Sequence, residues 1–556
     1  MAEEHNMLPA HQMGARQGRS TETALDLLVN QVHEIWRDRD HVASLLSLDI
    51  TGAYDRVVRS RLVHVLRAKG IPEQLAEWVG VFMTDRTSTL VLSGMETEER
   101  PISAGVPQGS PLSPILYLFY AAELLEACNS TTDRLSASAF VDDTTLLAYG
   151  QTTEGNCRIL ESAHNRCLDW ARRYGASFAP EKYDLIHLSR RPKKFNMQAQ
   201  MQLGSLVKAP TTSVRVLGVW LDPKLRWGEH VKVVLGKMKT QTNALIRTTA
   251  STWGATFASA RQIYSAVVRP ALAFGAAVWH PPQSGRQRGK RALPRGPAAR
   301  LMSVQNKCLR IVSGAYRATP ISVLETETFT PPLDLYLDAR LAQFRLRHKE
   351  SGMEDLVKNA CLKIRNKLRR RRRRQQQQPT QTEGEARTQW AETWVKDERQ
   401  ESLPAAKVLL SRWKRRWEAE RPRWGLLGDR EPGRAAVKRH AALRKAESAV
   451  ITQIRTGRIG LAAFLNMVRV PGIESPACPC GWARETAAHV IAHCPRFAGV
   501  RHHITEPHTG RVDIKSLTSS AEGTRRLAKW FIQLQLLPQF NLAEELLYGD
   551  EKGGPE

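Results

Sequence analysis

The chain has 556 residues, of which 42% are hydrophobic and 25% charged, so it is long enough to form two or more folded domains. Its net charge of +27 favours a polyanionic partner, either nucleic acid or an acidic membrane face, over a merely solubilising surface. The longest apolar stretch begins at Ile115 and is broken by Glu123, well short of the ~20 residues of a membrane span, and residues 1–14 lack an apolar run, so neither a membrane protein nor a secreted one is expected.

Two apolar runs of strand length end in carboxylates. Residues 41–49 (HVASLLSLD) end in Asp49, and residues 136–141 end in the pair Asp142 and Asp143 before an apolar run resumes. The second pattern predicts a hairpin whose two-residue turn holds the acids. If the strands are neighbours in one sheet, the carboxylates converge and suit two Mg²⁺ ions, which can activate a hydroxyl group and stabilise a leaving pyrophosphate. The alternative is an ordinary turn, because aspartate favours turns.

A strongly basic segment follows the region of strands and helices. Residues 361–374 contain nine lysines and arginines and no acid, and glutamines fill residues 375–378. This composition predicts a solvated linker or a helix extension rather than core. The run from Lys367 to Arg374 is suited to nonspecific phosphate binding, or alternatively to nuclear localisation.

Three of the eight cysteines lie close together near the C-terminus, with a histidine between them. One histidine and three cysteines suit tetrahedral Zn²⁺ in a structural site, and Gly481 allows a turn after the first pair. His493 is an alternative ligand, and cysteines buried without a metal are the other interpretation. The spacing favours a metal site in a reducing compartment over a disulfide framework. The ligands that the spacing favours are Cys478, Cys480, His489 and Cys494.

Six segments, in this order along the chain, resemble motifs of the reverse transcriptases of non-LTR, LINE-type retrotransposons, in particular the Jockey/Tad-like group. The first three resemble motifs A, B and C, and the others resemble motif D, the primer grip and the segment after the thumb. The segments are residues 49–55 (DITGAYD), 105–114 (GVPQGSPLSP), 140–143 (FVDD), 180–182 (PEK), 216–222 (VLGVWLD, followed by Trp227 and His230) and 304–320.

The resemblance implies roles for the acidic motifs. Asp49 and Asp142 match the two metal-binding aspartates, Asp143 is their adjacent partner, and the backbone carbonyl of Ile50 is an expected extra ligand. Tyr54 matches the steric gate, an aromatic ring that would clash with a ribose 2′-hydroxyl. A packed core tyrosine is the alternative for Tyr54.

The resemblance also implies roles outside the acidic motifs. Gln108 and Gly109 match the loop that contacts the template and the incoming nucleotide, where close backbone approach needs glycine. Lys182 matches the motif D lysine and is the candidate for protonating the leaving pyrophosphate or compensating its charge; an ordinary surface lysine is the alternative. After the loop, Ser113 and Pro114 form a typical N-cap and first turn, so we expect a helix over residues 115–128.

The expected fold class is α+β, a polymerase palm with a short antiparallel sheet and packed helices. The palm is expected over residues 1–224, and a helical thumb with the helices after it over residues 225–350. A basic, glutamine-rich linker over residues 351–389 should precede a helical C-terminal region with a CCHC zinc knuckle over residues 390–556. Residues 11–21 resemble the stretch that normally follows the fingers, so the fingers are expected to be largely missing, as are an endonuclease and an RNase H domain.

The function that the resemblance implies is RNA-directed DNA polymerisation, with transfer from a dNTP to a primer 3′-hydroxyl. The implied cofactors are two Mg²⁺ ions, for which Mn²⁺ can substitute, and one structural Zn²⁺. The implied partners are an RNA template and a DNA primer or target, with a further protein as a source of missing domains. Cytoplasmic synthesis and nuclear action are expected. The alternatives are a catalytically dead nucleic-acid-binding remnant and an intron-encoded maturase.

Overall fold

The computed structural model describes residues 2–129, 133–282, 296–369, 381–397, 399–420, 431–506 and 510–548. The chain divides into two units, and each is discontinuous in sequence. Unit 1 comprises Met1–His230, Gly275–Trp279 and Leu341–Thr393. Unit 2 comprises Val231–Phe274, His280–Arg340 and Trp394–Glu556. This division differs from the four successive segments expected from composition, because two later stretches of the chain return to unit 1.

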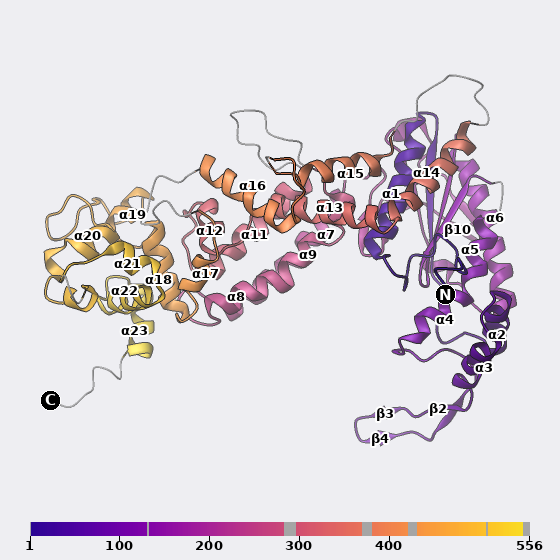
Figure 1. The fold of residues 1–556 in the computed structure, drawn as a ribbon, viewed down its shortest axis with the longest axis horizontal. Coiled ribbons are helices and arrows are strands. Elements are labelled where there is room, and N and C mark those ends of the chain that lie inside the picture. Colours follow the sequence, from indigo (N-terminus) through magenta and orange to yellow (C-terminus); the bar gives the residue numbers. More distant parts are fainter. Residues whose placement is uncertain are drawn as a thin grey trace. The chain divides into compact units, whose positions relative to one another are not determined.

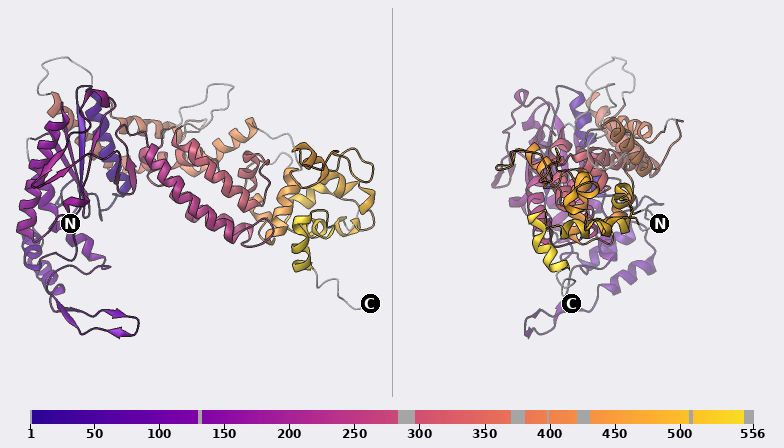
Figure 2. Two further views of the ribbon diagram at one scale, coloured as in Figure 1. Left: turned by 180° about the vertical axis from the view of Figure 1, so that it is seen from behind. Right: turned by 90° about the vertical axis from the view of Figure 1, so that its left-hand side faces the viewer.

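Unit 1 is built on an antiparallel sheet with strand order β6-β7-β1-β8 (Figure 1). The central strand β1 is apolar at nearly every position because helices cover both faces of the sheet. Helices α5 and α6 pack against one face and α1 against the other (Figure 2). The sheet strands are β1 (Val42–Leu48), β6 (Leu135–Phe140), β7 (Asp143–Gly150) and β8 (Asp184–Leu188). The helices of unit 1 up to the primer-grip segment are α1 (Thr21–Arg37), α2 (Arg59–Ala68), α3 (Glu73–Phe82), α4 (Leu112–Tyr120), α5 (Ala122–Asn129), α6 (Thr153–Tyr174), η1 (Pro180–Lys182) and η2 (Pro192–Lys194).

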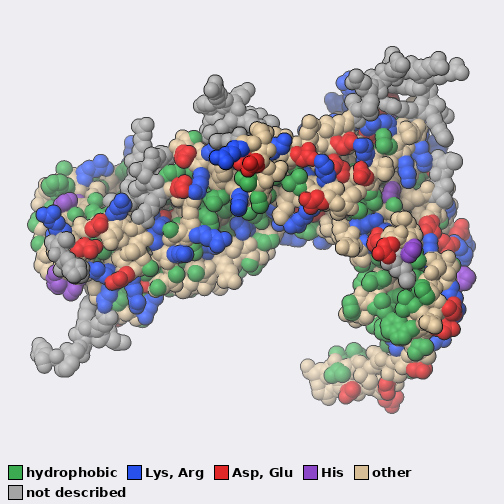
Figure 3. Space-filling view, in the orientation of Figure 1, with side chains coloured by type: hydrophobic (Ala, Val, Ile, Leu, Met, Phe, Trp, Pro, Cys, Tyr) green, Lys and Arg blue, Asp and Glu red, His purple; other side chains and the backbone are tan. Residues whose placement is uncertain are grey.

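Short two-stranded pairs complete the strands of unit 1 in the described residues. The pairs β2·β5 and β3·β4 form a narrow ribbon over residues 86–102, and Figure 3 shows apolar side chains exposed on this ribbon and around α3 and α4. The pairs β9·β10 and β11·β12 follow β8. Their bounds are β2 (Arg86–Ser88), β3 (Val91–Leu92), β4 (Met95–Glu96), β5 (Arg100–Ile102), β9 (Met201–Leu203), β10 (Leu206–Lys208), β11 (Val214–Val216) and β12 (Val219–Leu221).

The helix after the motif B loop begins earlier than expected. Helix α4 starts at Leu112 and ends at Tyr120, and Ala121 separates it from α5. Ser113 is therefore inside the first turn and is not the N-cap, so that part of the prediction is wrong. Its hydroxyl donates to the Pro107 carbonyl at 2.6 Å and ties the helix start to the preceding loop.

For the expected linker over residues 351–389, a solvated segment and a helix extension were both open. The described residues there are largely helical, and the expectation that they stay out of the core is wrong. Helix α14 (Met353–Arg369) buries Val357, Ala360 and Cys361 against α1, and α15 (Glu383–Trp394) follows. The apolar residues recur at helical spacing among the lysines and arginines, so one face of α14 belongs to the core. Most of the arginine run and all of the glutamine run fall in residues 370–380, which lie outside the described residues.

Two buried ion pairs fasten these later helices to α1. Arg345 Nη1 of α13 (Leu333–Glu350) donates to Asp26 Oδ2 at 2.8 Å, and Arg365 Nε of α14 donates to Glu34 Oε1 at 2.7 Å. All four side chains are buried. Removing one member of such a pair costs about 3–5 kcal/mol because a buried charge loses its partner.

Unit 2 is helical in its described residues. A buried carboxylate, Glu327, accepts hydrogen bonds from Arg439 and Arg455. Burial alone would raise the pKa of Glu327, but Arg455 and Arg439 hold it well below the usual range. Helices α7 (Gly228–Thr248), α13 and α15 cross the unit boundary. The described helices wholly in unit 2 are α8 (Phe257–Ile263), the π-helical η3 (Tyr264–Val268), α9 (Arg269–Ala273), α11 (Pro297–Ser313), α12 (Ile321–Glu327), α16 (Ala405–Ala419), α17 (Ala435–Arg439), α18 (Lys445–Thr456), α19 (Ala462–Met467), α20 (Ala487–Ala492), η4 (Pro495–Phe497), η5 (Arg501–Ile504), α21 (Ile514–Ser519), α22 (Ala521–Gln533), η6 (Pro538–Phe540) and α23 (Asn541–Tyr548).

The short helix α10 (Ala276–Trp279) belongs to unit 1. Among the helices of the described residues, none combines the length and the apolar character needed to cross a membrane.

Candidate functional site

Three carboxylates meet at one end of the main sheet. Leu48 of β1 pairs with Thr144 of β7. Asp49 follows Leu48 and Asp143 precedes Thr144, so these two aspartates lie side by side at the same end of the sheet. Directly opposite residues of antiparallel strands project to the same face. Asp142 adjoins Asp143 in the turn between β6 and β7. The two strand ends that are distant in sequence therefore bring their acids together.

The turn between β6 and β7 differs in detail from the one expected. Phe140 pairs with Asp143, so the two turn residues are Val141 and Asp142, and Asp143 is the first residue of β7. Val141 adopts φ +61°, a left-handed conformation that is unfavourable for a β-branched residue. A turn held in this way needs support from its surroundings.

That support comes from the N-terminal stretch. The Gln12 side chain, which is fully buried, accepts from Val141 N and donates to Val141 O, both at 3.3 Å. Gly14 lies so close that an added Cβ would be 2.4 Å from Val141 Cγ2 and 2.6 Å from Val141 N. The motifs assigned residues 11–14 no role in the active site, because a contact across 129 positions leaves no local pattern.

Lys182 lies at the acid cluster. Its Nζ is 3.2 Å from Asp49 Oδ2, and both side chains are partly exposed. Backbone hydrogen bonds bring the segment before Lys182 alongside Ile50: Thr51 N donates to Ser177 O at 2.8 Å, and Ala179 N donates to Asp49 O at 3.1 Å. The backbone of Ile50 is thereby fixed beside the carboxylates.

The neighbouring acids raise the proton affinity of Asp143. Burial raises the pKa of Asp143, and the charges of Asp142 and Asp49 raise it further, while Arg215 opposes them. Such repulsion is relieved when cations bind among the carboxylates. The strands therefore bring together groups that favour a positive ligand.

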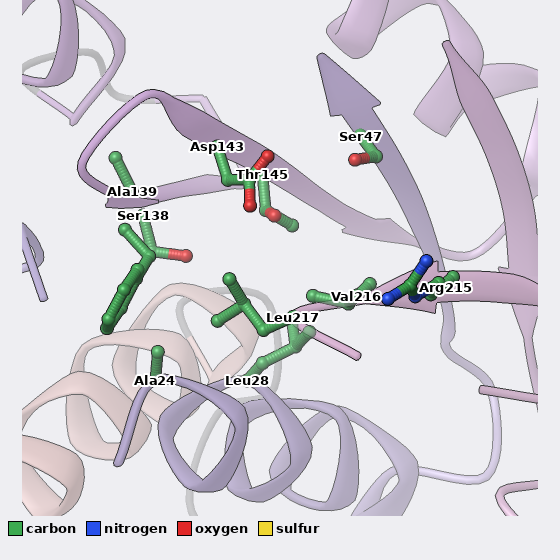
Figure 4. Close-up of a pocket in the computed structure, with 11 residues that line it drawn as sticks. Ala24, Leu28, Ser47, Ser138, Ala139, Asp143, Thr145, Arg215, Val216 and Leu217 are labelled. Carbon is green, nitrogen blue, oxygen red and sulfur yellow. The ribbon is translucent and has the colours of Figure 1, made fainter. Parts of the chain in front are cut away.

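A small cavity of about 50 Å³ lies beside Asp143 (Figure 4). Asp143 and Thr145 project into it from β7, and Arg215 and Leu217 line it from β11 and the turn that follows. Leu217 and Gly218 both have positive φ and form a two-residue hairpin turn, as expected for a primed turn. The sequence analysis singled out this segment from Val216 onward and missed Arg215. Arg215 lies between two buried valines of the strand, so its side chain projects from the face opposite to theirs.

Tyr54 is half-buried near the acids. Its ring stacks on Tyr117, with ring centroids 5.2 Å apart and planes 20° apart. Burial raises the pKa of Tyr54, and the charge of Asp142 adds to this effect. The Tyr54 carbonyl accepts from Val106 N at 2.8 Å, so the residue also holds the motif B loop. The Tyr54 ring thus packs against the core through Tyr117 and lies near the charge of Asp142 in the acid cluster.

The motif B loop lies against the segment after Asp49. Gln108 Nε2 donates to Asp55 Oδ1 at 2.9 Å, which gives Asp55 a structural partner. Gly109 has φ +90°, and nothing lies within 4 Å of a Cβ added there. Gly105 also has a positive φ, and a Cβ there would be 2.8 Å from Asp55 O. Gly109 therefore provides a left-handed backbone conformation beside open space. The close approach to another part of the backbone occurs at Gly105, which lies against Asp55.

The second cluster lies in unit 2. One ligand atom from each of Cys478, Cys480, His489 and Cys494 lies within 4.8 Å of the others. The Sγ atoms of Cys478 and Cys494 are 3.8 Å apart, and Cys480 Sγ is 3.2 Å from His489 Nε2. Tetrahedral zinc with Zn–S bonds of about 2.3 Å separates its sulfurs by about 3.8 Å, so the donor set fits this metal. His493, the alternative ligand, is not part of this group.

Local structure explains how the four groups converge. Gly481, with φ +92°, allows a tight turn in which Gly481 N donates to Cys478 O at 2.9 Å. Thr486 caps helix α20, which presents His489, and Cys494 follows just after that helix. Trp482 stacks on the His489 ring with centroids 5.3 Å apart and remains 57% exposed. Lysine and arginine side chains are spread over the face of unit 2 visible in Figure 3.

A family model described as reverse transcriptase (RNA-dependent DNA polymerase) matches residues 1–221. A 115 kDa protein of the type-1 retrotransposable element R1DM from Drosophila melanogaster is 25% identical over 88% of this chain and 43% of its own length. The RNA-directed DNA polymerase from the mobile element jockey of the same organism is 25% identical over 49% of this chain and 30% of its own length. The chain thus spans less than half the length of either relative.

Among solved structures, a telomerase from Candida tropicalis in complex with a telomeric RNA fragment aligns with a TM-score of 0.31 and 11% identity, over 67% of this chain and 53% of that one. The motifs, their meeting at one sheet end and the similarity to retrotransposon polymerases agree with one another. Residues 1–221 match the reverse transcriptase family, and the chain is similar in sequence to the proteins of the retrotransposable elements R1DM and jockey.

Proposed function

We propose that this chain is an RNA-directed DNA polymerase that extends a DNA primer along an RNA template, with the main sheet of unit 1 as its palm. The observation that carries the proposal is the register of β1 and β7, which sets Asp49 beside Asp143 with Asp142 in the adjoining turn. The match of residues 1–221 to the reverse transcriptase family supports it. The helices between residues 228 and 350 are the proposed thumb and the elements after it.

The acids would hold two divalent cations, Mg²⁺ or in its place Mn²⁺. Asp49 and Asp142 are the main proposed ligands, with Asp143 and the Ile50 carbonyl beside them. Bound ions of this kind activate a 3′-hydroxyl and stabilise a leaving pyrophosphate. The raised pKa of Asp143 supports cation binding, because neighbouring carboxylates repel until positive charge joins them.

The other residues of the site position the substrates. The Tyr54 ring, held by Tyr117, is the proposed steric gate against a ribose 2′-hydroxyl. The open backbone at Gly109, with Gln108 oriented by Asp55, is the proposed surface for the template and the incoming dNTP. Lys182 would leave Asp49 when cations bind and move its charge toward the pyrophosphate.

The Cys/His cluster is proposed to bind one structural Zn²⁺ as a CCHC knuckle. The 3.8 Å separation of two sulfurs and the buried positions of three ligands support this assignment. Trp482 and the basic residues nearby support contact with nucleic acid. Cytoplasmic synthesis and nuclear action follow from the proposed chromosomal DNA target.

Primer extension tests the polymerase proposal. The full chain, an RNA template with an annealed DNA primer, dNTPs and Mg²⁺ should give extended products that the variant Asp142→Ala with Asp143→Ala does not give. Asp169→Asn, which removes a charge from an exposed surface ion pair, serves as the control and should extend normally. Equal yields from the wild type and the double variant would reject the enzyme in favour of a noncatalytic nucleic-acid-binding protein.

A further inference from the structure

A cavity of about 500 Å³ lies within unit 2, away from both clusters described above. It opens between the ends of α7 and α11 and extends to α18 and η6. Its volume is in the range of small-molecule sites, large enough for one nucleotide but too small for a duplex. Its polar lining residues include Thr249, Ser251, Arg310, Tyr316, Gln453 and Gln539.

Three polar atoms of the lining have no hydrogen-bond partner among the described residues. The Thr249 hydroxyl is on a residue that is only 1% exposed, and the Gln453 Oε1 is on one that is 3% exposed. The other amide atom of Gln453, Nε2, donates to Gly314 O at 3.0 Å, which fixes the orientation of the side chain. Arg310 Nε is the third. Buried polar groups without partners are costly, so these atoms favour a polar ligand.

The positive charge at the cavity favours a ligand with negative charge. Arg310 donates to Asn306 O at 3.2 Å and forms no ion pair in the part of the chain that the structure describes. Burial lowers the pKa of Arg310, and the nearby charge of Arg317 lowers it further. Two neighbouring guanidinium groups without a carboxylate favour an anion such as a phosphate.

The end of α11 does not oppose an anion. The C-terminal carbonyls of a helix carry partial negative charge, which would repel a phosphate. Lys445 Nζ donates to Ile311 O at 2.8 Å and to Val312 O at 2.7 Å, so these carbonyls already have hydrogen-bond donors. The guanidinium of Arg310 therefore sets the sign of the local potential.

Aromatic and amide groups complete the site. The Tyr316 hydroxyl accepts from Gln539 Nε2 at 2.9 Å, and its ring is positioned by Phe464 at 5.2 Å between centroids. Trp253, in the turn that borders the cavity, is 57% exposed. Aromatic faces, amide edges and an arginine are the groups that bind an unpaired base and its phosphate.

We propose that this cavity holds one unpaired nucleotide of a single-stranded nucleic acid, with its phosphate on Arg310 and its base edge on Thr249 and Gln453. The inference rests on the proposed function in that a polymerase of this kind handles single strands. The proposed cavity is an additional nucleic-acid-binding site in unit 2, formed by neither the carboxylates nor the Cys/His cluster.

Cross-linking and binding test the proposal on the full chain. The probe is a fluorescein-labelled single-stranded RNA of ~20 nucleotides that carries 4-thiouridine, and the variants are Arg310→Met and Thr249→Val, with Arg525→Met as a charge-matched surface control. We expect cross-links in residues 249–253 or 310–316. We expect Kd to rise about tenfold in Arg310→Met and about threefold in Thr249→Val, because a charged and a neutral hydrogen bond are lost. The Arg525→Met control should bind as the wild type.

Two further measurements sharpen the result. Uridine monophosphate at millimolar concentration should displace the cross-link only weakly if a strand is the ligand, whereas full displacement would overturn the strand in favour of a free nucleotide. Circular dichroism checks folding, and Thr249→Val is nearly isosteric and removes only an unpaired hydroxyl. Unchanged Kd in both variants together with no cross-link in these segments would overturn the cavity assignment.

Primer extension separates the two proposals. Extension by the wild type with no cavity cross-link would reject the cavity and leave the polymerase intact. A cavity cross-link without extension would reject the polymerase and leave the nucleotide site intact.

Discussion

The acid cluster and the Cys/His cluster are held in different ways. The carboxylates follow strands of a sheet whose neighbours are buried, and the strained turn beside them is clamped by Gln12 and Gly14. The Cys/His cluster lies on a turn, a short helix and the residue just after it. The first site is organised by the fold itself, whereas the second, with the zinc proposed above, would depend on its ion to hold the segment together. Four predictions test this contrast.

The largest effect is expected from loss of zinc. Cys478→Ser with Cys494→Ser should abolish binding of the single Zn²⁺ equivalent, measured by metal analysis of the purified protein. Small structural zinc sites contribute an apparent ~10 kcal/mol to folding, so amide hydrogen exchange should rise over residues 478–494. Exchange in the sheet of unit 1 should stay unchanged. Zinc retained by the double variant, or lost in the control His493→Gln, would show that the ligands are misassigned.

A methyl group at Gly14 should disturb the acid cluster through the turn. Gly14→Ala places a Cβ in contact with Val141, at a cost of about 1–3 kcal/mol, and displaces Asp142. We expect kcat for primer extension to fall by about 100-fold, since small misplacements of reacting groups have effects of that size. Gly236→Ala, in an open part of α7, should keep its activity and gain up to ~1 kcal/mol of stability. Unchanged kcat in Gly14→Ala would contradict a positioning role.

Removing the lysine beside Asp49 should affect activity more than stability. Both side chains of the Lys182–Asp49 pair are partly exposed, so Lys182→Met should change the free energy of unfolding by less than ~1 kcal/mol. Primer extension should slow by about 10–100-fold if Lys182 acts on the pyrophosphate. Lys182→Arg, which keeps the charge but has a higher pKa, should restore only part of the rate. Full activity in Lys182→Met would remove this residue from the mechanism.

The smallest effect concerns pH. The pKa of Asp143 is raised by burial and by Asp142 and Asp49, so the folded protein holds this proton more tightly than the unfolded chain. Stability is therefore lost as pH rises from the ordinary aspartate value of about 3.9 through the raised value. Asp143→Asn should raise Tm slightly at pH 7 and leave it unchanged near pH 3. A lower Tm for the variant at pH 7 would contradict the repulsion described above.

The sequence predicted the strands of the acid cluster closely, because burial on both faces leaves continuous apolar runs. The runs 41–49 and 136–149 contain β1, most of β6 and β7. The motif order also predicted the similarity to retrotransposon reverse transcriptases that the comparisons then found. The roles of Asp49, Asp142, Lys182 and the zinc ligands remain predictions.

Long-range contacts are what the sequence did not reveal. The Gln12 clamp on Val141 and the packing of α14 on α1 join residues more than 100 positions apart. In α14 the lysines and arginines of residues 363–369 concealed the spacing of Val357, Ala360 and Cys361, which is helical and could have been recognised. The start of α4 was misplaced because Ser113 bonds backward to Pro107 instead of capping.

The return of residues 341–369 to unit 1 has a consequence for how the protein is made. Asp26 and Glu34 of α1 are buried against Arg345 and Arg365, which are translated more than 300 residues later. During synthesis, Asp26 lacks Arg345 and Glu34 lacks Arg365 until those two arginines leave the ribosome, although Arg37 of α1 already lies 3.4 Å from Glu34. A fragment that stops at residue 221 would keep the segments that resemble motifs A to D and still lack these partners. The nascent domain should therefore depend on chaperones until that late stretch docks.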